Sequence, residues 1–355
     1  SMESLGVFAV REWLARDQNN HGRFVRVVRP RQLGCWTKTS LTEGSQYLYE
    51  SKDGLHTYQD PQLPADLNEG YPATFVRKPG GESTPVEVIM RAALSVQAGG
   101  QLLTKANICS FRNNLNKIFG APLNLDDSWA VDGCLHSGTL YLDIVKGEEK
   151  EFPDSDRFMY YGYKFESLCT GAPPGSKVDA TSEFASLLGL QVGPHRILMA
   201  AEIDCTEAGA AAAANPVDAY LELKTYKLPQ HPGQEARMYE DKYPRWWLQS
   251  FLAGVPTLVL GGRDGDGTLQ KVEKVAVSML PSTAAAAAEQ SRRRQPFDAH
   301  QLLRFGTDCL SWMLEQAAAR PEQHLRFDYS KGSIQCSAVP GGDMPTRISV
   351  CLAGP

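Results

Sequence analysis

Charged side chains alternate in two short segments of this sequence, a Glu-x-Asp motif at positions 202–204 and a Glu-x-Lys motif at 222–224. On a β-strand, side chains at positions i and i+2 project from the same face. Two such strands would bring Glu202, Asp204, Glu222 and Lys224 into one small volume. Three carboxylates beside an ammonium suit Mg²⁺ or Mn²⁺, because these ions take oxygen ligands and share their coordination shell with substrate phosphates. The spacing alone equally fits two solvated strand faces, so the context must decide.

Two further polar residues lie in strongly apolar surroundings. Glu166 is embedded in the aromatic run 157–168. If it is buried it needs a cation or hydrogen-bond donors, because an unpaired buried charge is costly; the alternative is an exposed strand position. The pattern over 232–251 predicts a helix with Trp246, Trp247 and Phe251 on one broad face and Gln249 on a different one. A glutamine so placed is ordinarily a surface residue.

The elements that must position these residues alternate between strand and helix patterns. The Ala-rich linker within 206–218, the segment 281–296 and the N-terminal arm 1–22 are expected to lie outside the core. Asp264-Gly265-Asp266-Gly267 predicts a hairpin turn, since other residues of a calcium-binding loop are missing. Strands are predicted at 24–30, 197–205, 219–225 and 255–260, within 129–145, and twice after 325; helices are predicted at 85–96, 105–119, 232–251 and 297–319.

Composition limits the class of protein. The chain has 355 residues, 42% of them hydrophobic, and a formal net charge of −5, so a polyanion would have to be bound by a local patch. Arg23, Arg26, Arg29 and Arg31 form such a patch or a solvated strand face. The eight cysteines include no CxxC pair, which argues against a zinc site and a dense disulfide framework and favours a reducing compartment. No apolar run has transmembrane length.

Four segments in a fixed order resemble the eukaryotic decapping exoribonuclease (DXO) family. They are Gly162-Tyr163-Lys164-Phe165-Glu166, Glu202-Ile203-Asp204, Glu222-Leu223-Lys224 and Trp246-Trp247-x-Gln249-Ser250-Phe251. Each is a weak signal alone, but their joint order and spacing are improbable by chance. Weaker similarity covers most of the chain. The segment 181–192 fits the family less well, which bears on substrate preference.

The resemblance implies a PD-(D/E)XK nuclease-like fold. This is a single α+β domain over residues 1–355, with two packed mixed β-sheets flanked by helices. The implied metal ligands are Glu166, Glu202, Asp204, Glu222 and the carbonyl of Leu223. The implied catalytic residues are Glu166, Lys224 and Gln249, and the implied substrate-binding residues are Arg112, Lys224 and Gln249. Lys224 and Gln249 would hold the attacking water and the scissile phosphate, while Arg112 would steady the cluster or the 5′ end of the substrate.

Metal dependence follows from the implied site. Hydrolysis of a phosphodiester or pyrophosphate needs a nucleophilic water and a neutralised leaving oxygen, and two divalent ions about 4 Å apart provide both. Four carboxylates around one point repel each other unless cations offset their charge. Two Mg²⁺ or Mn²⁺ ions are therefore expected.

The resemblance also implies a function, a metal-dependent hydrolase for quality control of RNA 5′ ends. It would remove incomplete or noncanonical caps, including NAD caps, and whether 5′-to-3′ exoribonuclease activity accompanies this is left open. Its ligands would be single-stranded RNA 5′ ends and cap nucleotides, held through phosphates and aromatic stacking. A monomer is expected, in the nucleus and/or cytoplasm and without membrane association.

Two other functions compete with this one. The first is a non-catalytic stabilising partner of a nuclear 5′-to-3′ exoribonuclease. The second is a DNA-processing nuclease of the same fold superfamily. A purely structural role does not call for Glu166, Glu202, Asp204, Glu222 and Lys224 together, so the hydrolase is the leading hypothesis.

Overall fold

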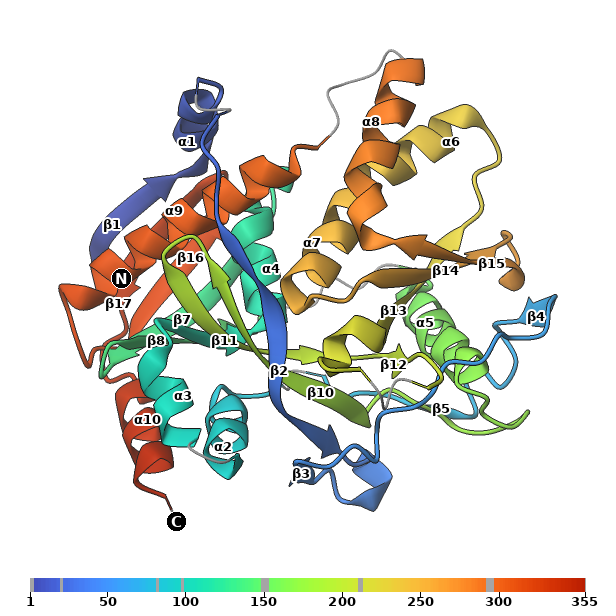
Figure 1. Cartoon of the computed structure of the whole chain (residues 1–355), viewed down its shortest axis with the longest axis horizontal. Helices are drawn as coiled ribbons and strands as arrows, with labels where there is room; N and C mark the ends of the chain where they lie inside the picture. Colours follow the sequence, from blue (N-terminus) through green and yellow to red (C-terminus); the bar gives the residue numbers. More distant parts are fainter. Residues whose placement is uncertain are drawn as a thin grey trace.

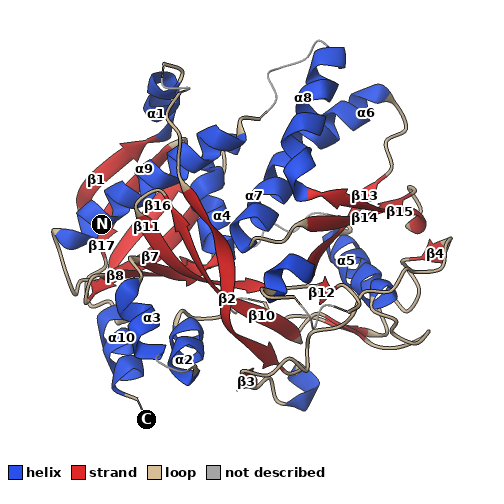
Figure 2. Ribbon diagram, viewed as in Figure 1, coloured by secondary structure: helices blue, strands red, loops and turns tan. Residues whose placement is uncertain are grey.

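Two mixed β-sheets form the centre of the molecule, and helices cover their faces (Figure 1 and Figure 2). The computed structural model describes residues 3–19, 22–80, 83–96, 99–147, 153–209, 213–291 and 297–354. The architecture is the α+β class predicted from the sequence. None of the described helices is both long enough and apolar enough to cross a membrane.

The larger sheet has ten strands and supplies one wall of the site. Its central strand β6 pairs in parallel with β8 and β11, and the other neighbours are antiparallel. In spatial order the strands are β1 (Ser4–Ala9), β17 (Ser333–Ala338), β16 (Leu325–Ser330), β7 (Trp129–His136), β8 (Thr139–Val145), β6 (Ile108–Phe111), β11 (His195–Glu202), β10 (Glu183–Val192), β2 (Val27–Lys38) and β3 (Tyr47–Tyr49).

The smaller sheet has five strands and supplies the opposite wall. The chain crosses from one sheet to the other between Glu202, which ends β11, and Cys205, which begins β12. The Glu-x-Asp motif therefore spans this crossing. In spatial order the strands are β12 (Cys205–Thr206), β13 (Tyr220–Lys227), β14 (Thr257–Arg263), β15 (Thr268–Ala276) and β4 (Ala65–Asp66), and β5 (Phe75–Val76) pairs separately with β9 (Val178–Asp179).

The helices pack on the sheets in three groups, visible in Figure 1. Helix α7 packs against α4 and, through Trp246, against Tyr226 of the small sheet. Helices α4 and α9 bury one face of the large sheet, and α2, α3 and α10 bury the other. Side chains alternate along β6, so Ile108 faces the helices on the first side of the sheet and Cys109 faces those on the second. Helix α5 covers the outer face of the small sheet. The helices are α1 (Val10–Asp17), α2 (Glu87–Ser95), α3 (Gly99–Lys105), α4 (Arg112–Gly120), α5 (Ser155–Cys169), α6 (Pro232–Arg237), α7 (Tyr243–Ala253), α8 (Leu280–Ser291), α9 (Ala299–Ala318) and α10 (Met344–Ala353).

Near the site, one prediction is wrong in element type and one open alternative is excluded. The helix predicted at 105–119 is the short strand β6 followed by α4. Periodicity cannot distinguish a short buried strand from a helix, and here hydrogen bonding to strands on both sides decides. The run 157–168 lies within helix α5, so Glu166 is not at an exposed strand position. Its buried aromatic residues recur at helical spacing, as at Tyr160, Tyr161 and Phe165.

Two segments expected outside the core contribute to it. Residues 280–291 form helix α8 instead of the predicted loop, because alanine has the highest helix propensity and Ala284 is buried; residues 292–296 of that prediction lie outside the described part. The N-terminal arm contains helix α1, and its residues 4–9 form the edge strand β1 against β17. In the linker 206–218, Val217 is buried in a 3₁₀ turn, and residues 210–212 lie outside the described part.

Other expectations are confirmed. All eight cysteines are free and buried. The segment 264–267 is the turn between β14 and β15, and the Asp264 carboxylate accepts the backbone N–H of Asp266 and of Thr268 at 2.9 Å each. In the basic segment, Arg23 pairs with Asp308 and Arg29 with Asp218, which favours the solvated strand face over a free cationic patch.

Candidate active site

Glu222 is a buried carboxylate on β13, with 1% of its side chain exposed. Its Oε2 accepts a hydrogen bond from Nη1 of Arg112, the first residue of α4, at 3.0 Å. Its Oε1 accepts from Nζ of Lys224 at 2.5 Å and from Nε2 of Gln249 at 2.6 Å. Burial alone would raise the pKa of Glu222, but the charges of Arg112 and Lys224 outweigh burial and hold the pKa below its usual value. This carboxylate is therefore both fixed and charged.

The elements that carry its partners agree with the predicted patterns. Lys224 lies two residues along β13 from Glu222, and the contact between them confirms that both project from one face. Burial lowers the pKa of Lys224, but the charges of Glu222 and Asp204 outweigh it and raise the pKa. On α7, Trp247 stacks on Phe251 at 4.6 Å in the apolar core, while Gln249 points to β13. Gln249 is thus a site residue and not an ordinary surface glutamine.

Asp204 lies in the crossing between the two sheets, beyond the end of the strand that carries Glu202. Its Oδ2 accepts the backbone N–H of Leu223 at 2.7 Å. In a strand the N–H and C=O of one residue point to the same side, so the carbonyl of Leu223 also faces the crossing. Burial and the charge of Glu222 raise the pKa of Asp204 to about 7.

Glu166 joins this group from α5. Burial, together with the charges of Asp204 and Glu202, raises the pKa of Glu166 well above its usual range. Glu202 lies at the edge of the group, with 41% of its side chain exposed. The structure thus brings together all the side chains that the sequence identified, and they come from α4, α5, the β11–β12 crossing, β13 and α7.

A second charged group, which the sequence analysis missed, borders the first. Nζ of Lys78 lies 3.8 Å from Oε2 of Glu202 and 3.5 Å from Oε2 of Glu183. Glu183 begins β10 and is opposite Lys38 of β2 in the sheet. Neither Lys78 nor Glu183 lies in a short motif. The pairing of β5 with β9 brings Lys78 near the start of β10, and the pairing of β10 with β11 brings Glu183 near Glu202.

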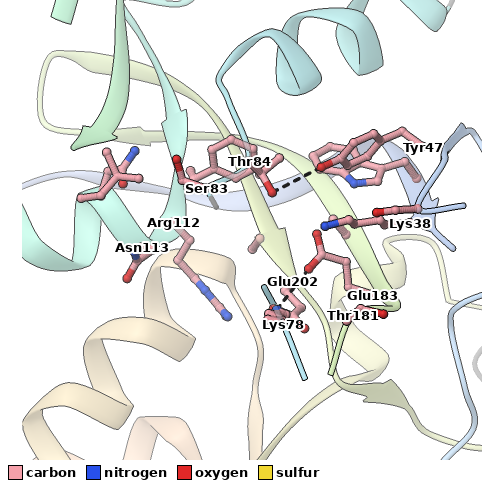
Figure 3. A pocket seen from close by; sticks show the side chains of 18 of the residues that line it. Lys38, Tyr47, Lys78, Ser83, Thr84, Arg112, Asn113, Thr181, Glu183 and Glu202 are labelled. Carbon is pink, nitrogen blue, oxygen red and sulfur yellow. Dashed lines mark hydrogen bonds and ion pairs between the residues drawn. The ribbon is translucent and has the colours of Figure 1, made fainter. Parts of the chain in front are cut away.

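Two cavities flank this charged boundary. One has a volume of about 400 Å³ and is lined by Arg112, Lys78, Trp36 and Tyr47 among others (Figure 3). The other has a volume of about 680 Å³ and includes Glu166 and Asp204 in its wall. Lys38, Glu183 and Glu202 line both cavities. Figure 3 shows Lys38, Lys78, Glu183 and Glu202 gathered on one side of the first cavity, with Arg112 across from them.

The donors of the acidic cluster fit a divalent metal ion. They are four carboxylates and a backbone carbonyl, the hard oxygen ligands that Mg²⁺ and Mn²⁺ prefer. Burial and the neighbouring acids raise the pKa values of Glu166 and Asp204, so a cation bound between them would favour the charged forms of both. Among the described residues, no three His, Cys, Asp or Glu side chains are already arranged around one point as ligands of a metal ion. The reason lies in the contacts above, since Glu222 is engaged by Arg112, Lys224 and Gln249, and Glu202 is paired with Lys78.

Comparison with known proteins links this site to a family. A family model described as RAI1 like PD-(D/E)XK nuclease matches residues 28–347. The human decapping and exoribonuclease protein is 31% identical over 273 residues, which cover 71% of this chain and 67% of the human protein. The chain thus spans about two thirds of the length of this relative.

Solved structures share the fold. Rai1 of S. pombe, solved in complex with 3′-FADP, aligns with a TM-score of 0.77 at 21% identity, covering 94% of this chain and 99% of that one. Rai1 of Candida albicans, solved in complex with pU5 and Mn²⁺, aligns with a TM-score of 0.77 at 20% identity, covering 92% of each chain.

Proposed function

The chain belongs to the family of RAI1-like PD-(D/E)XK nucleases, and from this premise we propose that it is a metal-dependent hydrolase of RNA 5′ ends. It removes incomplete or noncanonical caps, including NAD caps. The observation that carries the proposal is the convergence of four carboxylates with Lys224 and Gln249 from both sheets and two helices. The name of the human relative supports decapping, and the C. albicans complex supports an RNA substrate.

The acidic cluster is proposed to hold two Mg²⁺ or Mn²⁺ ions. When bound, such ions activate water and neutralise the leaving oxygen. The orientation of Leu223, whose N–H already meets Asp204, supports its carbonyl as a further ligand. The proposed ligands are Glu166, Glu202, Asp204, Glu222 and the carbonyl of Leu223.

Lys224 and Gln249 are proposed to position the reactants. Both donate to the same oxygen of Glu222, so an ammonium and an amide converge beside the cluster. The ammonium can hold a phosphate oxygen, and the amide oxygen of Gln249 can accept a hydrogen bond from the attacking water. Arg112 holds the second oxygen of Glu222, which fixes the carboxylate, and it also lines the first cavity, where it can meet a 5′ phosphate.

The experiment that tests the proposal uses RNAs that differ only in the 5′ end. Triphosphate, unmethylated-cap and NAD-cap RNAs with a labelled 5′ end are incubated with the protein and Mg²⁺ or Mn²⁺. We expect metal-dependent release of a cap nucleotide or dinucleotide from the capped RNAs and of phosphate or pyrophosphate from the triphosphate RNA, and no release with the Glu222→Gln variant. Absence of any released product from every RNA would refute the function. Matched DNA substrates separate it from a DNA nuclease.

Further properties follow from the proposed function. A 3′-labelled RNA tests for 5′-to-3′ exoribonuclease activity after cap removal. RNA 5′ ends occur in the nucleus and cytoplasm, so we propose that a monomeric protein acts in either compartment.

Association with a nuclear 5′-to-3′ exoribonuclease is proposed as an additional role. If the two proteins co-migrate and the Glu222→Gln variant still stabilises the exoribonuclease fully, the result would instead favour a stabilising role alone.

A further inference from the structure

Lys78 reaches the acidic cluster from a segment outside all the motifs. Its ammonium lies between two carboxylates, 3.8 Å from Glu202 and 3.5 Å from Glu183. Its side chain is 40% exposed and lines the first cavity (Figure 3). Both distances are longer than those of a tight ion pair, so the ammonium is shared between the two carboxylates.

The backbone before Lys78 is fixed, so the side chain is the part that can move. Nε and Nη2 of Arg77 donate to the two carboxylate oxygens of Asp156 at 2.8 and 2.7 Å. The Arg77 guanidinium also lies 4.9 Å from the ring centre of Phe75, in the strand that pairs with β9. Four methylene groups then allow the Lys78 ammonium to move between its two partners.

A metal ion and an ammonium compete for the same carboxylate. An ion held by Glu202 would lie close to the ammonium of Lys78, and two like charges at short range in a partly buried site repel strongly. Glu183 offers the ammonium a second partner that is not one of the proposed metal ligands. The ammonium therefore does not have to remain unpaired when it leaves Glu202.

We infer that Lys78 is a displaceable cation, which pairs with Glu202 while no divalent ion is bound and moves onto Glu183 when an ion takes Glu202. The inference rests on the proposed function, because it requires the ion site. Lys78 then sets the metal affinity of the enzyme without being a ligand. Glu183 lies in the segment 181–192, which fits the family pattern less well, so this pairing is a feature to test in this chain itself.

Direct titration with Mn²⁺ in a calorimeter tests the inference without relying on activity. Lys78→Met removes the competing ammonium, and we expect the dissociation constant for Mn²⁺ to fall about fivefold, the size typical of a partly exposed ion pair. Lys177→Met is the matched control, because Lys177 is exposed and lines the second cavity but not the first. Equal tightening in both variants would indicate a general effect of charge and overturn local competition.

A second variant tests the movement to Glu183. Glu183→Gln leaves Glu202 as the remaining carboxylate partner of Lys78, so we expect weaker Mn²⁺ binding, and we expect this loss to shrink when Lys78→Met is also present. Equal losses in the two backgrounds would overturn the shared-partner mechanism. If the parent protein binds Mn²⁺ and Lys78→Met leaves the dissociation constant unchanged, the inference is overturned while the proposed metal dependence stands. A parent protein that binds no Mn²⁺ overturns the proposed metal dependence as well.

Discussion

Two carboxylates of the site, Glu222 and Asp204, differ in charge state because their partners differ. Glu222 accepts from a guanidinium, an ammonium and an amide, and its pKa lies below the usual value. Asp204 has a backbone N–H as its donor and lies beside other acids, and its pKa is raised to about 7. The partners of Glu222 therefore favour its charged form, whereas the burial of Asp204 among other acids disfavours its charged form.

We predict that Glu202→Ala combined with Asp204→Ala abolishes hydrolysis without lowering stability. A carboxyl with a raised pKa favours the folded state at low pH, and this contribution is lost as the pH rises through about 7. At pH 8 in chelator, the melting temperature of the double variant should therefore equal or exceed that of the parent, and the difference should be smaller at pH 5. A large drop measured by calorimetry at pH 8 would mean that the two acids have a structural role.

Lys224 gives a second prediction at this scale. Lys224→Met should lower kcat at least about a hundredfold, the effect typical of losing one preorganised hydrogen-bond donor to the reacting group, while RNA binding changes little. Lys227→Met is the control, because Lys227 ends the same strand and is exposed. Single-turnover rates and filter binding separate the two effects. Loss of RNA affinity without loss of rate would assign Lys224 to substrate binding alone.

The sequence predicted the central residues of the site but not their charged neighbours. Glu222 and Lys224 are two positions apart on one strand, so local periodicity was sufficient to place them together. Lys78 and Glu183 meet because β5, which precedes Lys78, pairs with β9, which precedes Glu183. Such long-range pairing leaves no local pattern in the sequence.

At the scale of elements, the sequence was most reliable where a strand or helix is long and amphipathic. Helices α7 and α9 and strands β13, β16 and β17 lie where periodicity predicted them. It was least reliable for the short buried strand β6, whose residues Ile108 and Phe111 also fit a helix, and for α10, which no prediction included. In these elements tertiary packing decides the conformation.

The docking of α1 on α9 provides a test at this scale. Nε and Nη2 of Arg304 donate to the carboxylate of Asp17 at 2.8 Å each, and the two side chains are 1% and 3% exposed. Arg304→Met leaves this carboxylate buried without its cation, which should lower the free energy of unfolding by about 3–5 kcal/mol at pH 7. Arg23→Met removes a more exposed pair with Asp308 and should cost less than about 1 kcal/mol.

Asp17 makes the difference in unfolding free energy between the parent and Arg304→Met depend on pH. Burial would raise its pKa, but hydrogen bonds from Arg304 and Gln301 outweigh burial and lower it. A lowered pKa stabilises the folded state above the unfolded value of 3.8, and this stabilisation is lost as the pH falls through the folded value. Urea unfolding should therefore show a smaller gap between parent and Arg304→Met at pH 3 than at pH 7. A constant gap would mean that lost packing, not charge, explains the effect.

At the scale of the whole molecule, the site joins parts of the chain that are far apart in sequence. Arg112 follows the central strand of the large sheet, Glu222 lies in the small sheet, and Gln249 comes from the helix between them. The site thus forms only when both sheets are packed together. An ion that binds it must favour the folded state of the entire chain over the unfolded state.

Metal binding should consequently stabilise the protein as a unit. At a free Mn²⁺ concentration one hundred times the dissociation constant, the gain is about 2.7 kcal/mol, which for a chain of this size raises the melting temperature by roughly 3–6 °C. Calorimetry with and without chelator measures the shift, and a single transition should move as a whole. The double variant Glu202→Ala and Asp204→Ala should show no shift, because its remaining acids cannot complete an ion site. An equal shift in parent and variant would place the bound Mn²⁺ elsewhere on the molecule and remove the acidic cluster as its site.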